Sequence, residues 1–145
     1  MNFSIERVDW QSCERELHDV RYTVFVVGQN VPEELETDEL DPHCVHFIAR
    51  TVNGKPIGTA RVDQEGHIGR VAVLEEHRGL GVGTALMVAT MDHMRESGQS
   101  VALLNSQASA IPFYEKLGFE PCGDEFMEAG IPHVAMKKSF GKGAD

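Results

Sequence analysis

The chain has 145 residues, of which 41% are hydrophobic and 25% charged, and its formal net charge is −10. These values are typical of one soluble domain, and the acidic balance excludes a general nucleic-acid binder, which needs a basic surface. We find no apolar run of about 20 residues and no basic leader followed by an apolar stretch, so we expect a cytoplasmic protein without a membrane segment. The scattered Cys13, Cys44 and Cys122 indicate reduced thiols.

The pattern of apolar residues predicts a strand, a long helix and an irregular segment at the start of the chain. Residues 3–8 alternate as in a strand, and residues 10–27 show a helical period. Gly28 would end this helix as a left-handed residue. Residues 30–43 contain two prolines and six acidic side chains, a composition that predicts either a loop or a short acidic helix. We call residues 33–41 the acidic segment.

Three strands joined by tight turns are expected next. They are expected at residues 45–52, 57–63 and 67–74. Asn53-Gly54 is a strong signal for a hairpin turn, and Glu65-Gly66 indicates a second turn. Successive strands with such short connections form an antiparallel meander.

The second half of the chain alternates between helices and strands. A helix begins at Gly81 and runs to about Ser97, where Gly98 ends it. The remaining elements are expected as a buried strand at 100–104, a helix at 106–117 and strands at 119–127 and 134–138. The order predicts one α+β domain of residues 1–140 around a mixed sheet, followed by a tail at 141–145.

The most informative motif is RVAVLEEHRGLGVGTAL at residues 70–86, in which a buried strand enters a glycine-rich turn that opens into a helix. The glycines are Gly79, Gly81 and Gly83. Because they lack side chains, their backbone N–H groups can approach a phosphate closely. The helix adds its unpaired N–H groups and the positive end of its dipole. Arg78 and Thr84 offer further contacts, so the motif predicts a pyrophosphate site.

Other phosphate-binding motifs fit this turn less well. A P-loop ends in Gly-Lys-Ser/Thr, and the lysine is absent here. A dinucleotide fingerprint occupies the first strand-to-helix turn of a parallel sheet, whereas this turn follows an antiparallel meander. A merely structural turn would not need three alternating glycines beside an arginine.

At these residues the sequence resembles the GNAT superfamily of N-acetyltransferases. Residues 78–83 match its signature Arg/Gln-x-x-Gly-x-Gly/Ala, and residues 110–119 are similar to its Ala-x-x-x-Tyr-x-x-x-Gly-Phe element. The resemblance implies an α/β/α sandwich whose mixed, mostly antiparallel, roughly seven-stranded sheet splays between strands four and five. It also implies an enzyme that moves an acetyl group from acetyl-CoA to a primary amine by direct transfer.

The resemblance places acetyl-CoA between the splayed strands. The pantetheine arm would pair with the backbone of the fourth strand, as an added strand does, and the pyrophosphate would lie on the glycine-rich turn. The implied contacts are Val71, Ala72 and Val73 for the pantetheine, and Arg78, Gly79, Gly81, Val82, Gly83 and Thr84 for the pyrophosphate. Asn105 matches a polar contact to the pantetheine, and it could equally cap the following helix.

Tyr114 is the candidate general acid, because the family commonly uses the tyrosine at this position to protonate the departing CoA thiolate. The alternative is a packing role, as expected for neighbouring Phe113, which helical geometry turns to another face. The general base is open between His133 and the acidic segment, especially Glu36 and Asp38. The sequence also looks like a small, single-domain, bacterial-type subgroup, whose members commonly carry Glu where this chain has Gly28.

The acidic segment has two interpretations of equal weight. It is either a solvated, charge-rich loop, or a set of carboxylates that recruit a cationic amine opposite acetyl-CoA. Asp41, His43, Cys44 and His46 lack a second ligand pair at metal-site spacing, so we expect no metal. The strand expected to begin near His46 accounts for that histidine more simply.

The competing function is a non-catalytic module that binds or senses acetyl-CoA or CoA, because a fold can keep its binding site and lose its chemistry. Tyr114 separates the two functions, since binding alone does not require a proton donor at the thiol. The sequence leaves the acceptor open between a small-molecule amine and a protein amine. It also leaves open whether the chain forms a homodimer.

Overall fold

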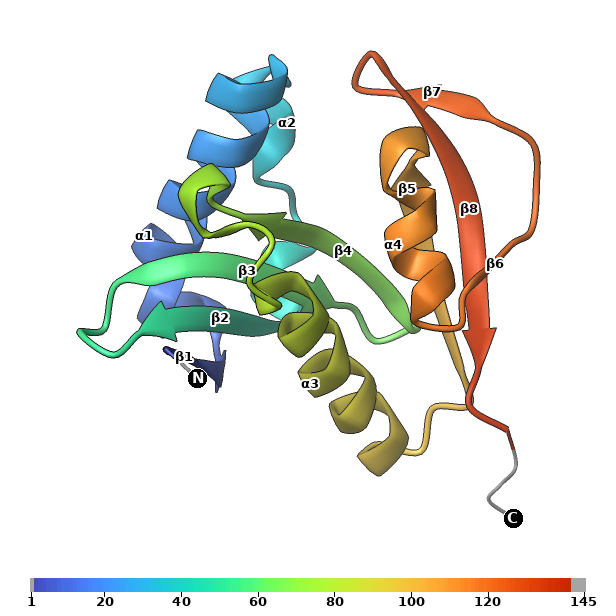
Figure 1. The fold of residues 1–145 in the computed structure, drawn as a ribbon, viewed down its shortest axis with the longest axis horizontal. Helices are drawn as coiled ribbons and strands as arrows, with labels where there is room; N and C mark the ends of the chain where they lie inside the picture. The colour runs from blue at the N-terminus through green and yellow to red at the C-terminus, as the bar shows by residue number, and fades with distance from the viewer. Residues whose placement is uncertain (1, 142–145) are drawn as a thin grey trace.

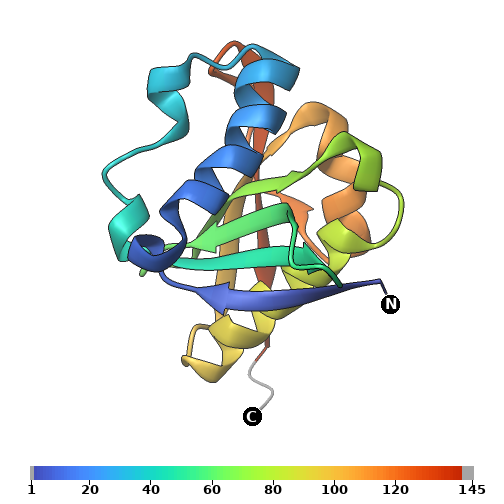
Figure 2. The same cartoon turned by 90° about the vertical axis from the view of Figure 1, so that its left-hand side faces the viewer.

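One open sheet with helices on both faces makes up the fold of the computed structural model, which describes residues 2–141 (Figures 1 and 2). The strands are β1 (Phe3–Val8), β2 (Val45–Thr51), β3 (Pro56–Val62), β4 (His67–Val73), β5 (Val101–Gln107), β6 (Glu120–Pro121), β7 (Phe126–Glu128) and β8 (Ile131–Ser139). The α-helices are α1 (Trp10–Arg21), α2 (Glu33–Glu36), α3 (Val82–Glu96) and α4 (Ile111–Lys116). A π-helix (Tyr22–Val27) and 3-10 turns (Asp41–His43, Glu75–His77 and Ala108–Ala110) complete the list.

The sheet order is β1-β2-β3-β4-β5-β8-β6, with β7 paired to β8. All neighbouring strands are antiparallel except β4 and β5, which are parallel. The α+β class, the meander and the mixed, mostly antiparallel sheet expected from the sequence are therefore confirmed. Of the expected tail at 141–145, residues 142–145 lie outside the described part of the chain.

The parallel pairing of β4 and β5 is very short. It joins only His67 to Leu103 and Ile68 to Leu104, whereas β5 pairs with β8 along its whole length. Beyond Ile68 the two strands diverge, as Figure 1 shows at the right-hand end of β4. The expected splay between the fourth and fifth strands is therefore present, and one edge of β4 is left open.

Alternation along β2 shows how the two faces of the sheet are covered. Phe47 and Ala49 belong to the large core cluster that contains the buried side chains of α3, whereas Ile48 packs with Trp10 and Leu17 near α1. Successive side chains of a strand point to opposite faces, so α1 and α3 must lie on opposite sides of the sheet.

Within residues 2–141, no helix is long and apolar enough to cross a membrane.

The first predicted helix covers the expected residues 10–27, but its last turns and the residue that ends it differ from the prediction. Its last six residues form a π-helix, and Gly28 has a right-handed φ of −80°, so the expected left-handed stop at Gly28 is wrong. Asn30, with φ 59°, takes the left-handed conformation instead. Asparagine tolerates this conformation better than most residues, so the turn falls two positions later.

The boundaries in the last third of the chain also differ from the expectation. Strand β5 continues through Gln107, because residues 105–107 pair with β8, so the helix predicted from Ser106 begins only at Ile111. Asn105 lies inside this strand, and its alternative role as a helix cap is therefore wrong. The strand expected at 119–127 is divided into the short strands β6 and β7.

Gly58 on β3 provides a test of how closely α3 packs on the sheet. A Cβ atom at this position would lie 2.9 Å from Leu86 Cδ1 and 3.1 Å from the carbonyl oxygen of Ala72. We expect Gly58→Ala to lower the free energy of unfolding by about 1–3 kcal/mol, measured by urea denaturation, because the core is overpacked. Gly123→Ala is the control, since nothing lies within 4 Å of that added atom. Equal midpoints for the two variants would contradict this packing.

Candidate active site

A cavity of about 1330 Å³ lies where β4 and β5 diverge. Its wall includes all ten residues expected to contact acetyl-CoA: Val71, Ala72, Val73, Arg78, Gly79, Gly81, Val82, Gly83, Thr84 and Asn105. It also includes all four candidate catalytic residues: Tyr114, His133, Glu36 and Asp38. One cavity thus brings together side chains that are up to about a hundred positions apart in the sequence.

The glycines of the turn serve two purposes. Gly79 and Gly81 have φ values of 78° and 88°, a left-handed conformation that costs other residues roughly 1–2 kcal/mol. Gly83 has no such constraint, but a Cβ atom there would lie 3.3 Å from Phe113 Cζ, so it allows close packing of α3 against α4. The turn and the helix start are therefore shaped by backbone geometry and by packing together.

The N-terminus of α3 offers unpaired donors to the cavity. The first hydrogen bond of this helix runs from the Ala85 N–H to the Gly81 carbonyl, at 3.0 Å. Within residues 2–141 the N–H groups of Val82, Gly83 and Thr84 have no acceptor, and no side chain caps the helix. Such a helix start attracts anions through its free N–H groups and its dipole.

Backbone groups of β4 also face the open edge. The Val73 carbonyl accepts a hydrogen bond of 2.8 Å from Arg78 Nε, whereas the Ala72 carbonyl lies toward Gly58 on β3. By the alternation of a strand, Val71 directs its polar groups to the same side as Val73. With no strand paired there, this edge can accept an extended ligand. Arg78 itself is exposed beside the turn.

Tyr114 on α4 presents a neutral phenol to the cavity. Its ring packs edge-on against Phe113 and Phe119, with ring centroids 4.9 Å and 6.0 Å away. The residue is 9% exposed, and burial raises the pKa of its hydroxyl to about 12. Within residues 2–141 this hydroxyl has no hydrogen-bond partner, although it is not sealed from solvent. A protonated, unpartnered hydroxyl is suited to donate a proton.

His133 on β8 is buried and held in a defined orientation. Its Nδ1 lies 2.7 Å from the Ile131 carbonyl oxygen, and its ring stacks on Phe126 at 6.0 Å. Because a carbonyl can only accept, Nδ1 carries the proton of the neutral ring and Nε2 keeps its lone pair. The histidine can therefore act as a base through Nε2.

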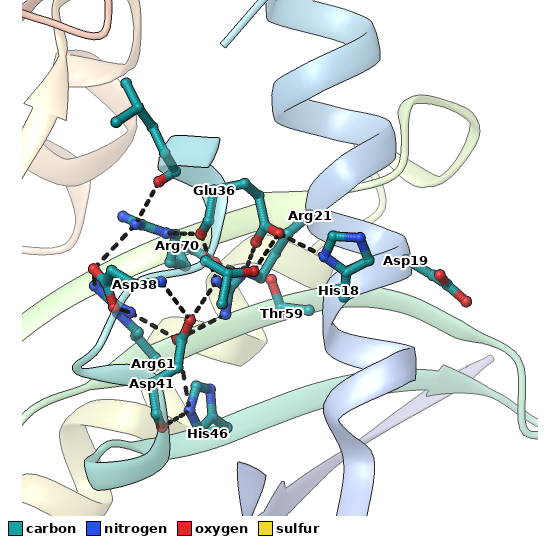
Figure 3. A network of polar contacts seen from close by, with 12 residues as sticks. His18, Asp19, Arg21, Glu36, Asp38, Asp41, His46, Thr59, Arg61 and Arg70 are labelled. Atoms are coloured by element: carbon teal, nitrogen blue, oxygen red, sulfur yellow. Dashed lines mark hydrogen bonds and ion pairs between the residues drawn. The ribbon is translucent and has the colours of Figure 1, made fainter. Parts of the chain in front are cut away.

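The acidic segment is fixed by arginines that come from three other elements (Figure 3). Arg21 of α1 pairs with Glu36 through Nε and with both oxygens of Asp41, at 3.0 Å and 2.9 Å. Arg61 of β3 donates to Asp41 at 2.7 Å and to both oxygens of Asp38, at 2.7 Å and 2.8 Å. The side chains of Arg21, Glu36 and Asp41 are fully buried.

Arg70 completes this network from β4. It donates to Asp38 at 3.2 Å and to the backbone carbonyl groups of Leu35 and Glu36. Its own φ of 52° marks an irregularity in β4, where the register against β3 shifts. Three arginines therefore neutralise three carboxylates, and the acidic segment forms a rigid wall of the cavity.

These contacts disfavour Glu36 and Asp38 as general bases. Hydrogen bonds from Arg61 lower the pKa of Asp38 to about 2, although partial burial opposes the shift. A carboxylate with such a low pKa takes up a proton very poorly at neutral pH. Both oxygens of Glu36 are occupied, one by Arg21 and the other by His18 Nδ1 at 2.7 Å and the Thr37 hydroxyl.

The sequence analysis overlooked the arginine partners and a pair of glutamines. The sequence did carry a signal for the arginine partners. Arg21 follows Leu17 by four residues on the apolar face of the helix, and a buried arginine there needs a partner of opposite charge. Gln29 and Gln107, from opposite walls of the cavity, are hydrogen-bonded to each other. Since 77 residues separate them, no local pattern indicates this contact.

Comparisons with known proteins agree with this geometry. The family model described as acetyltransferase (GNAT) domain matches residues 6–140. YjcF, an uncharacterized N-acetyltransferase of Bacillus subtilis, is 42% identical over 123 residues, covering 82% of this chain and 87% of YjcF. The crystal structure of Escherichia coli ElaA superposes with a TM-score of 0.84 at 27% identity, covering 94% of this chain and 99% of ElaA. An acyl-CoA N-acyltransferase of Pseudomonas aeruginosa gives 0.83 at 27%, with the same coverage.

The buried network predicts that acid destabilises the fold. The folded state lowers the pKa of Asp38 and Asp41, and burial lowers that of His46 from 6.5, so all three bind protons more readily when unfolded. We expect the urea midpoint to fall as pH drops below about 6.5, and to fall further between pH 3.8 and about 2. Asp38→Asn should lower the midpoint at pH 7 and weaken the second decline.

The matched control is Asp92→Asn, which removes the exposed Asp92–Arg95 pair of α3. Surface substitutions of this kind change stability by no more than about 0.5 kcal/mol. If Asp38→Asn and Asp92→Asn have the same midpoints at pH 7, the network does not hold the acidic segment in place.

Proposed function

This chain belongs to the GNAT family of acetyltransferases, and we propose that it transfers an acetyl group directly from acetyl-CoA to a primary amine, with Tyr114 as general acid and His133 as general base. The observation that supports the proposal is one cavity lined by the first residues of α3, by Tyr114 and by His133, whose Nδ1 is held by the Ile131 carbonyl. GNAT acetyltransferases use acetyl-CoA as co-substrate.

The cavity has features that suit acetyl-CoA. The unpaired N–H groups of residues 82–84 and the exposed Arg78 fit the pyrophosphate, because both place positive potential beside the turn. The open edge of β4 at residues 71–73 fits the amide-bearing pantetheine arm, which would extend the sheet. Asn105, on the opposite strand, offers an amide to the same arm. Thr84 adds a hydroxyl at the helix start.

His133 supports the attack of the amine. An alkylamine is largely protonated at neutral pH and is a nucleophile only as the free base. Nε2 of His133 can take its proton, because the Ile131 carbonyl holds the ring proton on Nδ1. Glu36 and Asp38 are less suited to this role, since hydrogen bonds from Arg21 and Arg61 occupy their oxygens, and we assign them to the wall of the acceptor site.

Tyr114 supports the departure of the thiol. When the new C–N bond forms and the C–S bond breaks, the electron pair goes to sulfur, and the phenol donates its proton there. The raised pKa of Tyr114, about 12, keeps the phenol protonated until this moment. The ammonium proton that His133 takes first passes to solvent, and the nitrogen loses a second proton to His133 as the amide forms. This second proton balances the one that Tyr114 has given to sulfur, and exchange with solvent restores both groups.

Replacing the phenol tests the acid. We expect Tyr114→Phe to lower kcat by about 10²- to 10⁴-fold, because the thiolate must then leave without a proton. The Kd for acetyl-CoA should stay unchanged, since the ring that packs against Phe113 and Phe119 is kept. Thiol release with a panel of primary amines gives kcat, and calorimetry gives Kd.

The chain's other tyrosine supplies the control, because Tyr22 lies in the π-helix, where its ring packs at a tilt against His18. Tyr22→Phe should keep full turnover. Normal turnover of Tyr114→Phe with a cognate amine would remove Tyr114 from the mechanism, and tight acetyl-CoA binding without turnover on any amine would argue against transfer itself.

A pH profile tests the base. We expect His133→Gln to lower kcat at pH 7 by about 10²-fold, and the deficit should shrink as pH approaches the pKa of the amine, because the free base then no longer needs proton removal. His93→Gln on α3, whose ring accepts from Arg7, serves as control and should keep the wild-type profile. A deficit that is independent of pH would indicate a structural role for His133.

A further inference from the structure

Gln29 and Gln107 form a closed amide pair that spans the cavity. The Gln107 side-chain N–H donates to Gln29 Oε1 at 2.8 Å, and the Gln29 N–H donates back to Gln107 Oε1 at 3.3 Å. Gln29 follows the π-helix on the α1 side, and Gln107 is the last residue of β5. The pair therefore links the two halves of the molecule beyond the point where β4 and β5 separate.

The pair lies beside the candidate base. Gln107 and His133 are direct partners in the antiparallel ladder of β5 and β8, so their side chains project from the same face with Cβ atoms about 4.5–5.5 Å apart. All three residues line the cavity. An amine that gives its proton to His133 therefore brings the substituent on its neighbouring carbon next to the two amides.

Each amide retains hydrogen-bonding capacity inside the pair. A glutamine side chain carries two N–H donors and an oxygen with two lone pairs, and the pair uses one donor and one lone pair of each. A donor and an acceptor thus remain on each side, partly buried in the cavity wall. A hydroxyl group, which both donates and accepts, complements this set, whereas a carboxylate or an ammonium group satisfies only half of it.

The charged side chains around the cavity also bear on which acceptor it can bind. Of its arginines, Arg61 and Arg70 are occupied by Asp38 and Arg78 lies at the glycine-rich turn, so they are poorly placed to bind the carboxylate of an amino acid. The carboxylates of Glu36 and Asp38 are in turn paired with arginines, so they are poorly placed to attract the ammonium groups of a polyamine, and the other carboxylates on the wall belong to Asp63, Glu65 and Glu128. Glu128, at the tip of the β7–β8 hairpin, accepts a hydrogen bond from Asn105 at 3.4 Å.

We propose that the Gln29–Gln107 pair recognises the acceptor, and that this acceptor is a primary amine with a hydroxyl group on the carbon next to the amine-bearing carbon. The inference rests on the proposed function for the place of the reacting amine. The apolar side chains of Phe25, Val31 and Ile131, which share the cavity wall, contact the carbon skeleton. Gln29 and Gln107 thereby determine specificity, and they do not take part in proton transfer.

Two matched amines test the substrate class. We compare trans-2-aminocyclohexanol with cyclohexylamine, which differs only by lacking the hydroxyl, and add spermidine and glycine as a polyamine and an amino acid. We expect kcat/KM for the amino alcohol to exceed that for cyclohexylamine by at least about tenfold, the effect of one good hydrogen bond in a cavity. Calorimetric titration of each amine into the enzyme saturated with CoA should give the same order of affinity.

Substitutions then assign the discrimination to the pair. Gln29→Met and Gln107→Met keep the side-chain length and remove the amide. Each should raise KM for the amino alcohol by about tenfold, leave KM for cyclohexylamine and Kd for acetyl-CoA unchanged, and so abolish the preference. Because the two amides act together, the double variant should lose little more than either single one. Gln11→Met, at an exposed position of α1, is the control and should keep the preference.

The outcomes separate this inference from the proposed function. Turnover with a preference for spermidine or glycine, equal kcat/KM for the two cyclic amines, or an unchanged preference in both Met variants would each overturn the inference and leave acetyl transfer intact. Absence of turnover with every amine would contradict the proposed function instead. In that case the titrations still decide the inference, because they report recognition of the hydroxyl without chemistry.

Discussion

The parallel contact between β4 and β5 lasts for only two residue pairs, and the divergence beyond it creates the site. A continuous ladder would have used the polar backbone groups of residues 71–73, and the cavity between the strands would not exist. Since β5 is held along its whole length by β8, the separation is a stable part of the fold. The start of α3, Tyr114 on α4 and His133 on β8 all reach the space that this divergence opens.

The two sides of that space are built by different forces. The side next to α3 and α4 depends on backbone geometry and packing, through left-handed Gly79 and Gly81 and the close approach of Gly83 to Phe113. The side next to α1 depends on buried ion pairs, in which Arg21 and Arg61 hold the acidic segment against the sheet. Removing one partner of such a buried pair is costly, so these ion pairs stabilise this wall.

Local sequence patterns were sufficient to predict the elements whose conformation depends only on neighbouring residues. The strand at 3–8, the turns at Gly54 and Gly66 and the glycine-rich start of α3 follow from periodicity and from the conformations that glycine allows. The errors have long-range causes. Strand β5 extends to Gln107 because β8 pairs with it, although the residues after Leu104 are polar, and the hydrogen bonds of a distant strand do not show in a local pattern.

By itself the sequence determined the fold class, the family and the glycine-rich turn before α3, because glycine spacing and hydrophobic period act over a few residues. Only the tertiary structure decided how the acidic segment is held: the carboxylates of Glu36, Asp38 and Asp41 are paired with Arg21, Arg61 and Arg70. The structure alone also brought Gln29 to Gln107 and set both beside His133. The physical reason is that charge and hydrogen-bonding capacity in a folded protein depend on partners distant in sequence, which the topology selects.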